Sequence, residues 1–246
     1  MEAAGVSQAD WDEALQEKIQ SQKYSAWCMA AGWANQEILF VRWAEEQGLN
    51  LAYAISEDLD KNPRLLDEYP LYISVGHDEY WSTAMRDNVE SFISSGGKAA
   101  FFSGNTAFWQ ARFEDDRQTL VSYKTNLKAD PFYNSIHAPE LTSMWSDPLV
   151  GRPESEMTGV SFSYGGYAHM PNAPKGTGGY KVWEPEHWAF DSISTTVGSD
   201  LGVEDITVAY ECDGCPIQII DGIPKPIESM VPKGCLLYTS PSPRDS

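Results

Sequence analysis

The stretch Leu71–Gln110 reads LYISVGHDEYWSTAMRDNVESFISSGGKAAFFSGNTAFWQ and holds the clearest secondary-structure pattern of the chain. The apolar run Leu71–Val75 predicts a strand, and Ser82 is placed to cap a helix. The pair Gly96–Gly97 predicts the end of that helix, and residues 98–103 predict a second strand. A strand, a helix and a strand with short connections predict a right-handed βαβ unit with parallel strands.

Polar side chains follow both strands of this unit. His77, Asp78, Glu79 and Tyr80 come directly after the first strand, and Asn105 follows the second. Ligands of open α/β sheets bind at the carboxyl ends of the strands, where these residues are expected. An imidazole, carboxylates and a phenol suffice for general acid/base catalysis or for a metal. The sequence therefore predicts a site at this edge, while a network that caps the helix accounts for the same residues equally well.

The α/β pattern continues on the amino-terminal side and weakens after Gln110. We expect helices that begin near Ser7 and at Asn35, a strand over residues 49–55 and a short helix led by Pro63. Beyond Gln110 turn signals dominate. Further expected elements are extended segments at 121–124, 160–164 and 179–183, a helical turn at 184–190 and a strand at 206–212. The carboxyl-terminal half is therefore expected to be rich in loops.

Composition narrows the classes of function. The 246 residues, 42% of them hydrophobic, suit one large domain. A formal charge of -19 repels phosphate backbones and anionic membranes, which argues against nucleic-acid binding. No apolar run approaches the roughly 18 to 20 residues that span a bilayer, and no signal peptide is recognised. We expect a soluble chain whose compartment is unknown.

Several common catalytic motifs are missing. The corner Ser103–Thr106 has no cysteine nucleophile and no GxSxG elbow, which argues against cysteine and serine hydrolases. Neither GxGxxG nor a P-loop is present. The spacing of Cys212 and Cys215 favours ordinary thiols or one local disulfide over redox catalysis. His137 and His187 are interpreted as surface or packing residues.

Two motifs, GHDEYW at Gly76–Trp81 and GNTAFW at Gly104–Trp109, resemble a known family. Together with Glu186–Phe190 (EHWAF) and Tyr210–Gly214 (YECDG), they make the chain similar over about 36–214 to the carboxyl-terminal domain of the N,N-dimethylformamidase large (beta) subunit family. The resemblance implies a doubly wound, mostly parallel, Rossmann-like α/β sheet, similar to class I glutamine amidotransferase-like domains. It also implies hydrolysis of amide carbon–nitrogen bonds.

The same resemblance implies a mononuclear iron held by two tyrosine phenolates and one glutamate. Tyr80 matches the first phenolate and Glu211 the carboxylate, whereas Phe108 stands at the position of the second phenolate. Phenylalanine cannot ligate, and ferric iron needs anionic oxygen donors. We therefore expect Tyr80 and Glu211 at a metal site that lacks its third ligand. The expected catalytic residues are His77, Asp78, Glu79 and Asn105.

These observations divide the chain into three parts. Residues 1–34 form an amino-terminal helix and an irregular segment, 35–233 the α/β domain, and 234–246 resemble a translated sequencing-adaptor tail. The expected function is hydrolysis of a small-molecule amide by metal- or carboxylate-activated water. The alternative is a non-catalytic α/β domain that binds a small molecule or carbohydrate within a larger multidomain protein. Additional domains or a small subunit are possible partners.

Overall fold

The structure is a computed structural model that describes residue 33 and residues 37–167, 180–201 and 211–227. The chain divides into two compact units. The smaller unit contains the residues up to Tyr53 together with Val75–His77, and the larger unit contains the remainder. The helix expected near Ser7, the strand segment 206–210 and the tail 234–246 lie outside the described residues.

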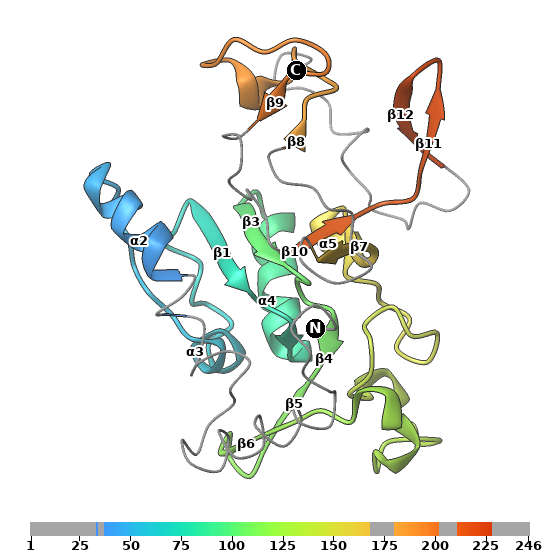
Figure 1. The fold of residues 1–246 in the computed structure, drawn as a ribbon. Helices are drawn as coiled ribbons and strands as arrows, with labels where there is room; N and C mark the ends of the chain where they lie inside the picture. The colour runs from blue at the N-terminus through green and yellow to red at the C-terminus, as the bar shows by residue number, and fades with distance from the viewer. Residues whose placement is uncertain (1–32, 34–36, 168–179, 202–210, 228–246) are drawn as a thin grey trace, which may run out of the picture. The chain divides into compact units, whose positions relative to one another are not determined.

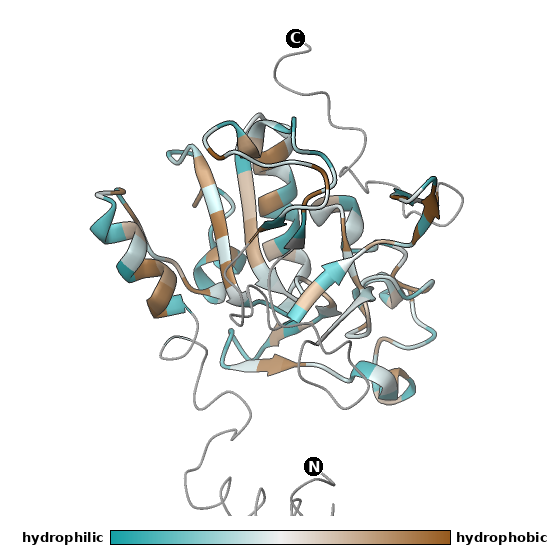
Figure 2. Ribbon diagram, turned by 45° about the horizontal axis from the view of Figure 1, so that its top comes forward, coloured by the Kyte–Doolittle hydropathy of each residue, from teal (hydrophilic) through white to brown (hydrophobic). Residues whose placement is uncertain are grey.

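The smaller unit is built on helix α2 (Glu37–Glu46), which confirms the helix expected after Asn35. Ala44 is its buried residue, and brown hydrophobic positions are visible along the helix in Figure 2. The strand expected over 49–55 is wrong. The Tyr53 hydroxyl donates back to Glu45 Oε1 at 2.8 Å, and the segment is largely exposed. An alternating pattern forms a strand only where a partner strand is at hand.

The expected βαβ unit is confirmed in its helix and its two long strands. These are β1 (Leu71–His77), α4 (Thr83–Ser94) and β3 (Lys98–Gly104). β1 pairs with β3, and their arrows point the same way in Figure 1. Ser82 caps α4, since its Oγ accepts the Met85 backbone N–H at 3.1 Å.

Helix α4 ends at Ser94, just before Gly96 and Gly97, as this pair of glycines predicted. Gly96 has a φ of +101°, a left-handed conformation that glycine adopts without the steric cost of a Cβ. The prediction of a short helix led by Pro63 is wrong. The structure has α3 at Ser56–Lys61 instead, with turns after it. Glu57 and Asp58 lie in the first turn of α3, where carboxylates are favoured by the helix dipole.

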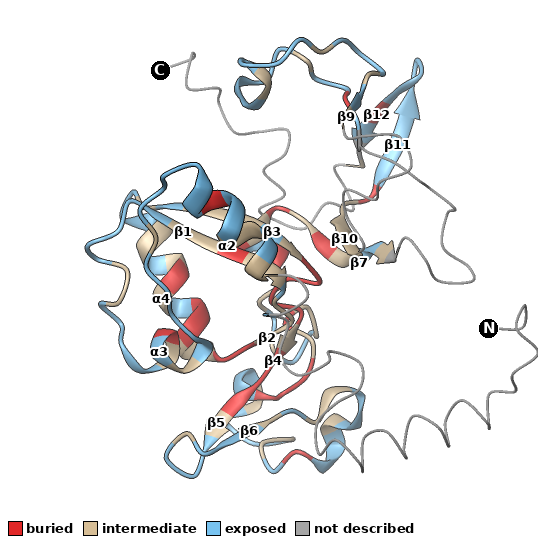
Figure 3. Ribbon diagram, turned by 60° about the vertical axis from the view of Figure 1, so that its left-hand side comes forward, coloured by how far each residue is buried: buried red, intermediate tan, exposed pale blue. Residues whose placement is uncertain are grey.

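The core of the larger unit lies against α4. Met85 and Val89 of α4 pack with Leu59, Trp81 and Trp145, and all five are almost fully buried. Figure 3 shows buried, intermediate and exposed positions along α4. The apolar face at i and i+4 thus fixes how the helix packs.

The other strands are short. The described residues form six two-stranded sheets, not one continuous sheet. Besides β1 with β3, the pairs are β2 (Tyr80–Trp81) with β4 (Trp109–Gln110), β5 (Arg112–Glu114) with β6 (Thr119–Val121), β7 (Ser161–Tyr167) with β10 (Glu211–Gly214), β8 (Tyr180–Lys181) with β9 (Asp200–Leu201), and β11 (Ile217–Ile220) with β12 (Ile223–Pro226). The β2–β4 pair is parallel and the others after it are antiparallel. The fold is mixed α/β.

Loops and short helical turns dominate after β4, as the turn signals predicted. The helical turns are η3 (Lys124–Ala129), η4 (Ala138–Glu140), α5 (Ser155–Thr158) and η5 (Trp188–Phe190). The turn η5 confirms the helical turn expected at 184–190. Within the described part of the chain, no helix is long and apolar enough to cross a membrane.

A buried ion pair fixes the loop that follows β6. Arg112 Nη1 lies 2.9 Å from Asp130 Oδ2, and the Arg112 guanidinium stacks 4.0 Å above the Phe132 ring. The backbone N–H and the hydroxyl of Thr142 also donate to Asp130 Oδ2. Burial raises the pKa of Asp130, but these hydrogen bonds outweigh burial and lower it to about 2. The carboxylate therefore stays ionised inside the fold.

Candidate functional site

The segment after β1 and the segment after β3 lie side by side. The Ala107 N–H donates to the Asp78 carbonyl at 2.8 Å, and the Trp109 N–H donates to the Glu79 carbonyl at 2.9 Å. These bonds lead directly into the parallel β2–β4 pair. The two polar clusters expected from the sequence, apart from His77, therefore come together within the larger unit.

A chain of hydroxyl groups joins the two clusters beneath this corner. Ser74 Oγ donates to Asp78 Oδ2 at 2.7 Å and lies 3.1 Å from Ser103 Oγ. Ser103 Oγ in turn lies 2.6 Å from Thr106 Oγ1. The Ser74 hydroxyl thereby fixes the orientation of the half-buried Asp78 carboxyl group.

Asp213 of β10 holds the corner after β3. Its two carboxylate oxygens accept the backbone N–H groups of Asn105 at 2.8 Å and Thr106 at 3.0 Å. Asn105 has a φ of +52°, a conformation that asparagine tolerates better than most residues. Successive N–H groups around such a residue form a concavity that binds an anion, and Asp213 supplies that anion from within the chain.

Asn105 itself is 3% exposed. Among the residues that the structure describes, its side-chain Oδ1 has no hydrogen-bond partner. A buried polar atom without a hydrogen-bond partner destabilises the folded chain. In a native structure such an atom calls for an explanation, and a catalytic role is one of them. Its place beside the Asp213 contact supports the expectation that Asn105 belongs to the site.

The backbone of β10 passes very close to Gly104. A Cβ built on Gly104 would lie 2.5 Å from the Glu211 carbonyl oxygen and 2.8 Å from the Glu211 Cβ. Only glycine permits this approach, because a side chain would push the two strands apart. Glu211 is thereby brought to the end of β3, which agrees with its expected place near the site.

We expect Gly104→Ala to lower the free energy of unfolding by about 1 to 3 kcal/mol, because the methyl group has no room against the β10 backbone. Urea denaturation followed by tryptophan fluorescence measures the change. Gly166→Ala is the matched control, since a Cβ there has no atom within 4 Å. Equal stability of the two variants would contradict the close approach of β10 to β3.

Tyr80 and Lys124 form a contact that the sequence did not predict. The Lys124 ammonium lies 4.7 Å from the centroid of the Tyr80 ring. Burial is the main cause that raises the pKa of Tyr80, Lys124 lowers it in part, and Glu79 raises it further. The phenol is therefore protonated at neutral pH and able to donate a hydrogen bond.

The remaining expected residues are placed as follows. Glu79 is half-buried beside Tyr80, and Glu211 is half-buried on β10. His77 is exposed at the end of β1 and belongs to the smaller unit. Asp213 lies in the motif YECDG together with Glu211, but its contact with the backbone of Asn105 and Thr106 was not predicted. Lys124 was not predicted as a site residue, and no local signal marks it.

The residues at the expected iron positions do not supply a complete donor set. Phe108 is buried, with its ring packed edge-on against Trp109 at 5.2 Å and Phe162 at 5.8 Å, and it offers no donor atom. Over the described ranges, no group of three or more His, Cys, Asp or Glu residues is placed to hold a metal ion. In the described part of the chain, Cys212 and Cys215 are half-buried and are not joined to each other by a disulfide bond.

The larger unit is therefore a mixed α/β domain in which the segments that carry Asp78, Tyr80 and Asn105 lie beside a parallel strand pair. The chain belongs to the N,N-dimethylformamidase beta subunit-like, C-terminal family, whose model matches residues 6–242. The expected family is thus confirmed. No curated protein sequence matches the chain.

Proposed function

We propose that this domain hydrolyses the carbon–nitrogen bond of small amides. Family membership over residues 6–242 carries the proposal, because the family is named after an amide hydrolase. Three side chains of the larger unit support the proposal. They are the carboxyl group of Asp78, which accepts a hydrogen bond from Ser74, the phenol of Tyr80 and the buried amide of Asn105.

In the proposed reaction a carboxylate takes a proton from water, which then attacks the amide carbonyl, and the protonated carboxyl group returns that proton to the amide nitrogen as the carbon–nitrogen bond breaks and the amine leaves. Asp78 suits this role because Ser74 holds it in one orientation, and Glu211 is the second candidate. We assign to Tyr80 and Asn105 the donation of hydrogen bonds to the oxygen that becomes negative as the tetrahedral intermediate forms. Iron at Tyr80 and Glu211 would need a third anionic donor, because Phe108 supplies none, so no step is assigned to a metal.

The test is an assay of amine release from N,N-dimethylformamide, formamide and acetamide by the purified chain with any subunit that co-purifies. We expect Asp78→Asn to lower kcat/KM by roughly 100-fold or more, the usual contribution of a general base. Glu211→Gln tests the second candidate. Asp200→Asn is the control, because Asp200 forms an exposed ion pair with Lys181. Full activity of both site variants would contradict the proposed chemistry.

A second function is favoured by Phe108. Its buried ring replaces a donor atom at a position where the family resemblance implies a metal ligand. A domain altered in this way is suited to bind a small molecule or carbohydrate without converting it. If the unaltered chain releases no amine from any amide in the assay, this binding function takes precedence over hydrolysis.

We further infer that the chain assembles with a partner subunit and that its parallel strands belong to a larger sheet. The family is that of a beta subunit, which supports a partner subunit of a second type. The pairing of β1 with β3 and the parallel β2–β4 pair support the inference of a larger, doubly wound sheet. We propose that they are the part of such a sheet that the described residues contain.

A further inference from the structure

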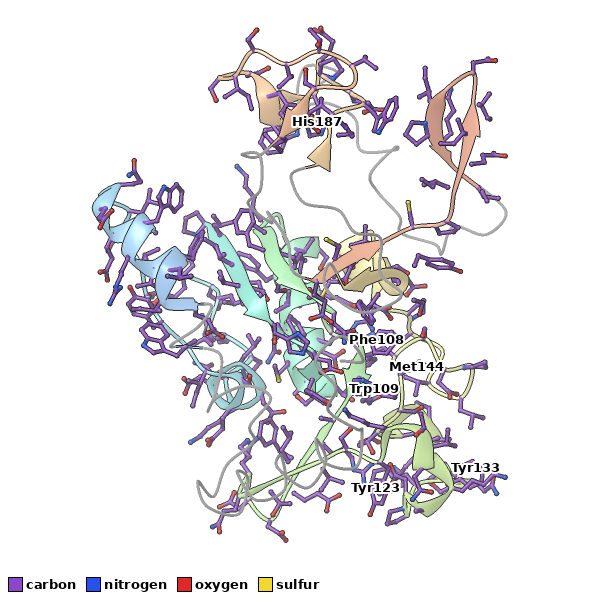
Figure 4. The ribbon with its side chains drawn as sticks, viewed as in Figure 1. Phe108, Trp109, Tyr123, Tyr133, Met144 and His187 are labelled. Atoms are coloured by element: carbon purple, nitrogen blue, oxygen red, sulfur yellow. The ribbon has the colours of Figure 1, made fainter. Side chains whose placement is uncertain are left out.

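A cavity lies at the beginning of β1 and β3, at the end of these strands opposite to the candidate site. Its volume is about 600 Å³, within the range of pockets that bind small molecules. It is lined by Pro70, which precedes β1, and by Lys98, the first residue of β3. Figure 4 shows Phe108 and Trp109 beyond the other end of β3. The cavity is therefore separate from the corner at residues 103–106.

Three segments of the larger unit enclose the cavity. They are the loop before β1, the last turns of α4 and the glycine turn that follows α4. The polar residues that line it are Asp67, Tyr69, Asn88, Ser91, Ser95 and Lys98. A Cβ built on Gly97 would lie 2.4 Å from the Phe92 ring, so only glycine lets this ring lie against the backbone of the turn. The wall that Phe92 forms is thus part of the fold.

Several polar groups of the cavity are not used within the fold. In the described part of the chain, the hydroxyls of Tyr69 and Ser91 and the ammonium of Lys98 form no hydrogen bond or ion pair. These three groups are donors. Asn88 Nδ2 donates to the Leu59 carbonyl at 2.7 Å, and Asn88 Oδ1 is left as an acceptor. The cavity therefore offers both donors and acceptors to a ligand.

The charges favour a neutral ligand. The Lys98 ammonium repels a cation within the cavity, and the formal charge of -19 on the whole chain repels an anion that approaches it. The Asp67 carboxylate on the rim is paired with Arg64 at 2.7 Å. Hydroxyl groups of a neutral ligand can use the donors and the acceptors together, because each hydroxyl both donates and accepts. The Tyr69 ring, 44% exposed, offers a flat apolar surface to the C–H face of a sugar.

We propose that this cavity binds a neutral carbohydrate, with a sugar ring against Tyr69. Ser91 and Lys98 donate to hydroxyl oxygens of the sugar, and Asn88 Oδ1 accepts from one of its hydroxyls. The site is independent of amide hydrolysis and of the binding function favoured by Phe108, because it shares no residue with the candidate site. Glucose and galactose are the probes, and glucuronate is the anionic counterpart of the same size.

The experiment is titration of the nitrogen-15-labelled chain with each sugar, followed by the NMR shifts of its backbone amides. For at least one neutral sugar we expect saturable shifts at Gly97 and Lys98 with a Kd on the order of 1 mM. The amides of Asn105 and Thr106 should not shift. Tyr69→Ala should weaken binding about tenfold through loss of the ring. Ser91→Ala should weaken it about fivefold through loss of one hydrogen bond.

Tyr164→Ala and Ser94→Ala are the matched controls. Tyr164 is 43% exposed on β7, Ser94 is exposed on α4, and neither lines the cavity. Circular dichroism confirms that each variant is folded before titration.

Three results would overturn the proposal. They are the absence of saturable shifts at Gly97 and Lys98 with both neutral sugars, equal affinity in Tyr69→Ala and the unaltered chain, and tighter binding of glucuronate than of either neutral sugar. Because the titration needs no turnover, a chain that binds a sugar here but cleaves no amide would retain this site and lose only the proposed hydrolysis.

Discussion

Asp130→Ala is expected to lower the free energy of unfolding by about 3 to 5 kcal/mol. The change removes one partner of a buried ion pair and leaves the Arg112 guanidinium, which is itself buried, without its main counter-charge. It also leaves the Thr142 N–H without its acceptor. Urea denaturation at neutral pH measures the loss.

The matched control is Asp67→Ala. Asp67 pairs with Arg64 at 2.7 Å, but both side chains are well exposed. An exposed pair of this kind contributes at most about 1 kcal/mol. If the two alanine variants lost the same stability, the Arg112–Asp130 pair would not be a buried anchor.

The same carboxylate gives stability a defined pH dependence. The pKa of Asp130 is about 2 in the folded chain, below its ordinary value of 3.8. A lowered pKa stabilises the fold above the ordinary value, and this contribution of about 2 kcal/mol is lost as the pH falls through 4 toward 2. Asp130→Asn should therefore differ from the unaltered chain by a constant amount near neutral pH and by less at about pH 2. A difference that grew on acidification would contradict this sign.

Asp213→Asn is expected to release the corner after β3. The carboxylate of Asp213 accepts two backbone N–H groups, from Asn105 and Thr106, and an asparagine side chain offers one acceptor oxygen and an NH2 that cannot accept. Loss of charge from one hydrogen bond and of the other bond altogether should cost about 3 kcal/mol. Under the proposed function, amide hydrolysis should fall with it, because Asn105 is no longer held.

Hydrogen exchange gives the sharpest measurement of this change. In the unaltered chain the Asn105 and Thr106 amides should be protected, and in Asp213→Asn they should exchange much faster while the amides of α4 remain protected. Asp200→Asn serves as the control, since the Asp200 side chain is exposed on β9. Unchanged exchange at Asn105 and Thr106 would show that the Asp213 contact does not hold the corner.

The elements β1, α4 and β3 could be predicted from the sequence because interactions between residues close together in the chain form them. Ser82 caps α4 through an atom three residues away, and Gly96 ends it by adopting a positive φ. The strand expected over 49–55 failed for the opposite reason. A strand is stabilised by its partner, and the alternation of Leu49, Tyr53 and Ile55 carries no information on whether one is present.

In the candidate site, too, some features follow from local sequence patterns and others depend on contacts between distant segments. The sequence predicted that the segments with Asp78, Tyr80 and Asn105 lie together, because they follow strands whose ends must meet at one edge of a parallel pair. The contacts of Asp213 and Lys124 were not predicted. Their contacts, with Asn105 and with Tyr80, join residues far apart in the chain. No pattern within a short window encodes which distant loop returns to that edge.

The amino-acid sequence by itself determined the βαβ unit, the family and the polar residues at the strand ends, because caps, glycine stops and apolar periodicity act over a few residues. The tertiary structure alone decided that Asp213 holds the corner, that Glu211 lies against Gly104 and that Lys124 lies over the Tyr80 ring. Those outcomes depend on how distant segments pack together, and packing is a property of the folded chain as a whole.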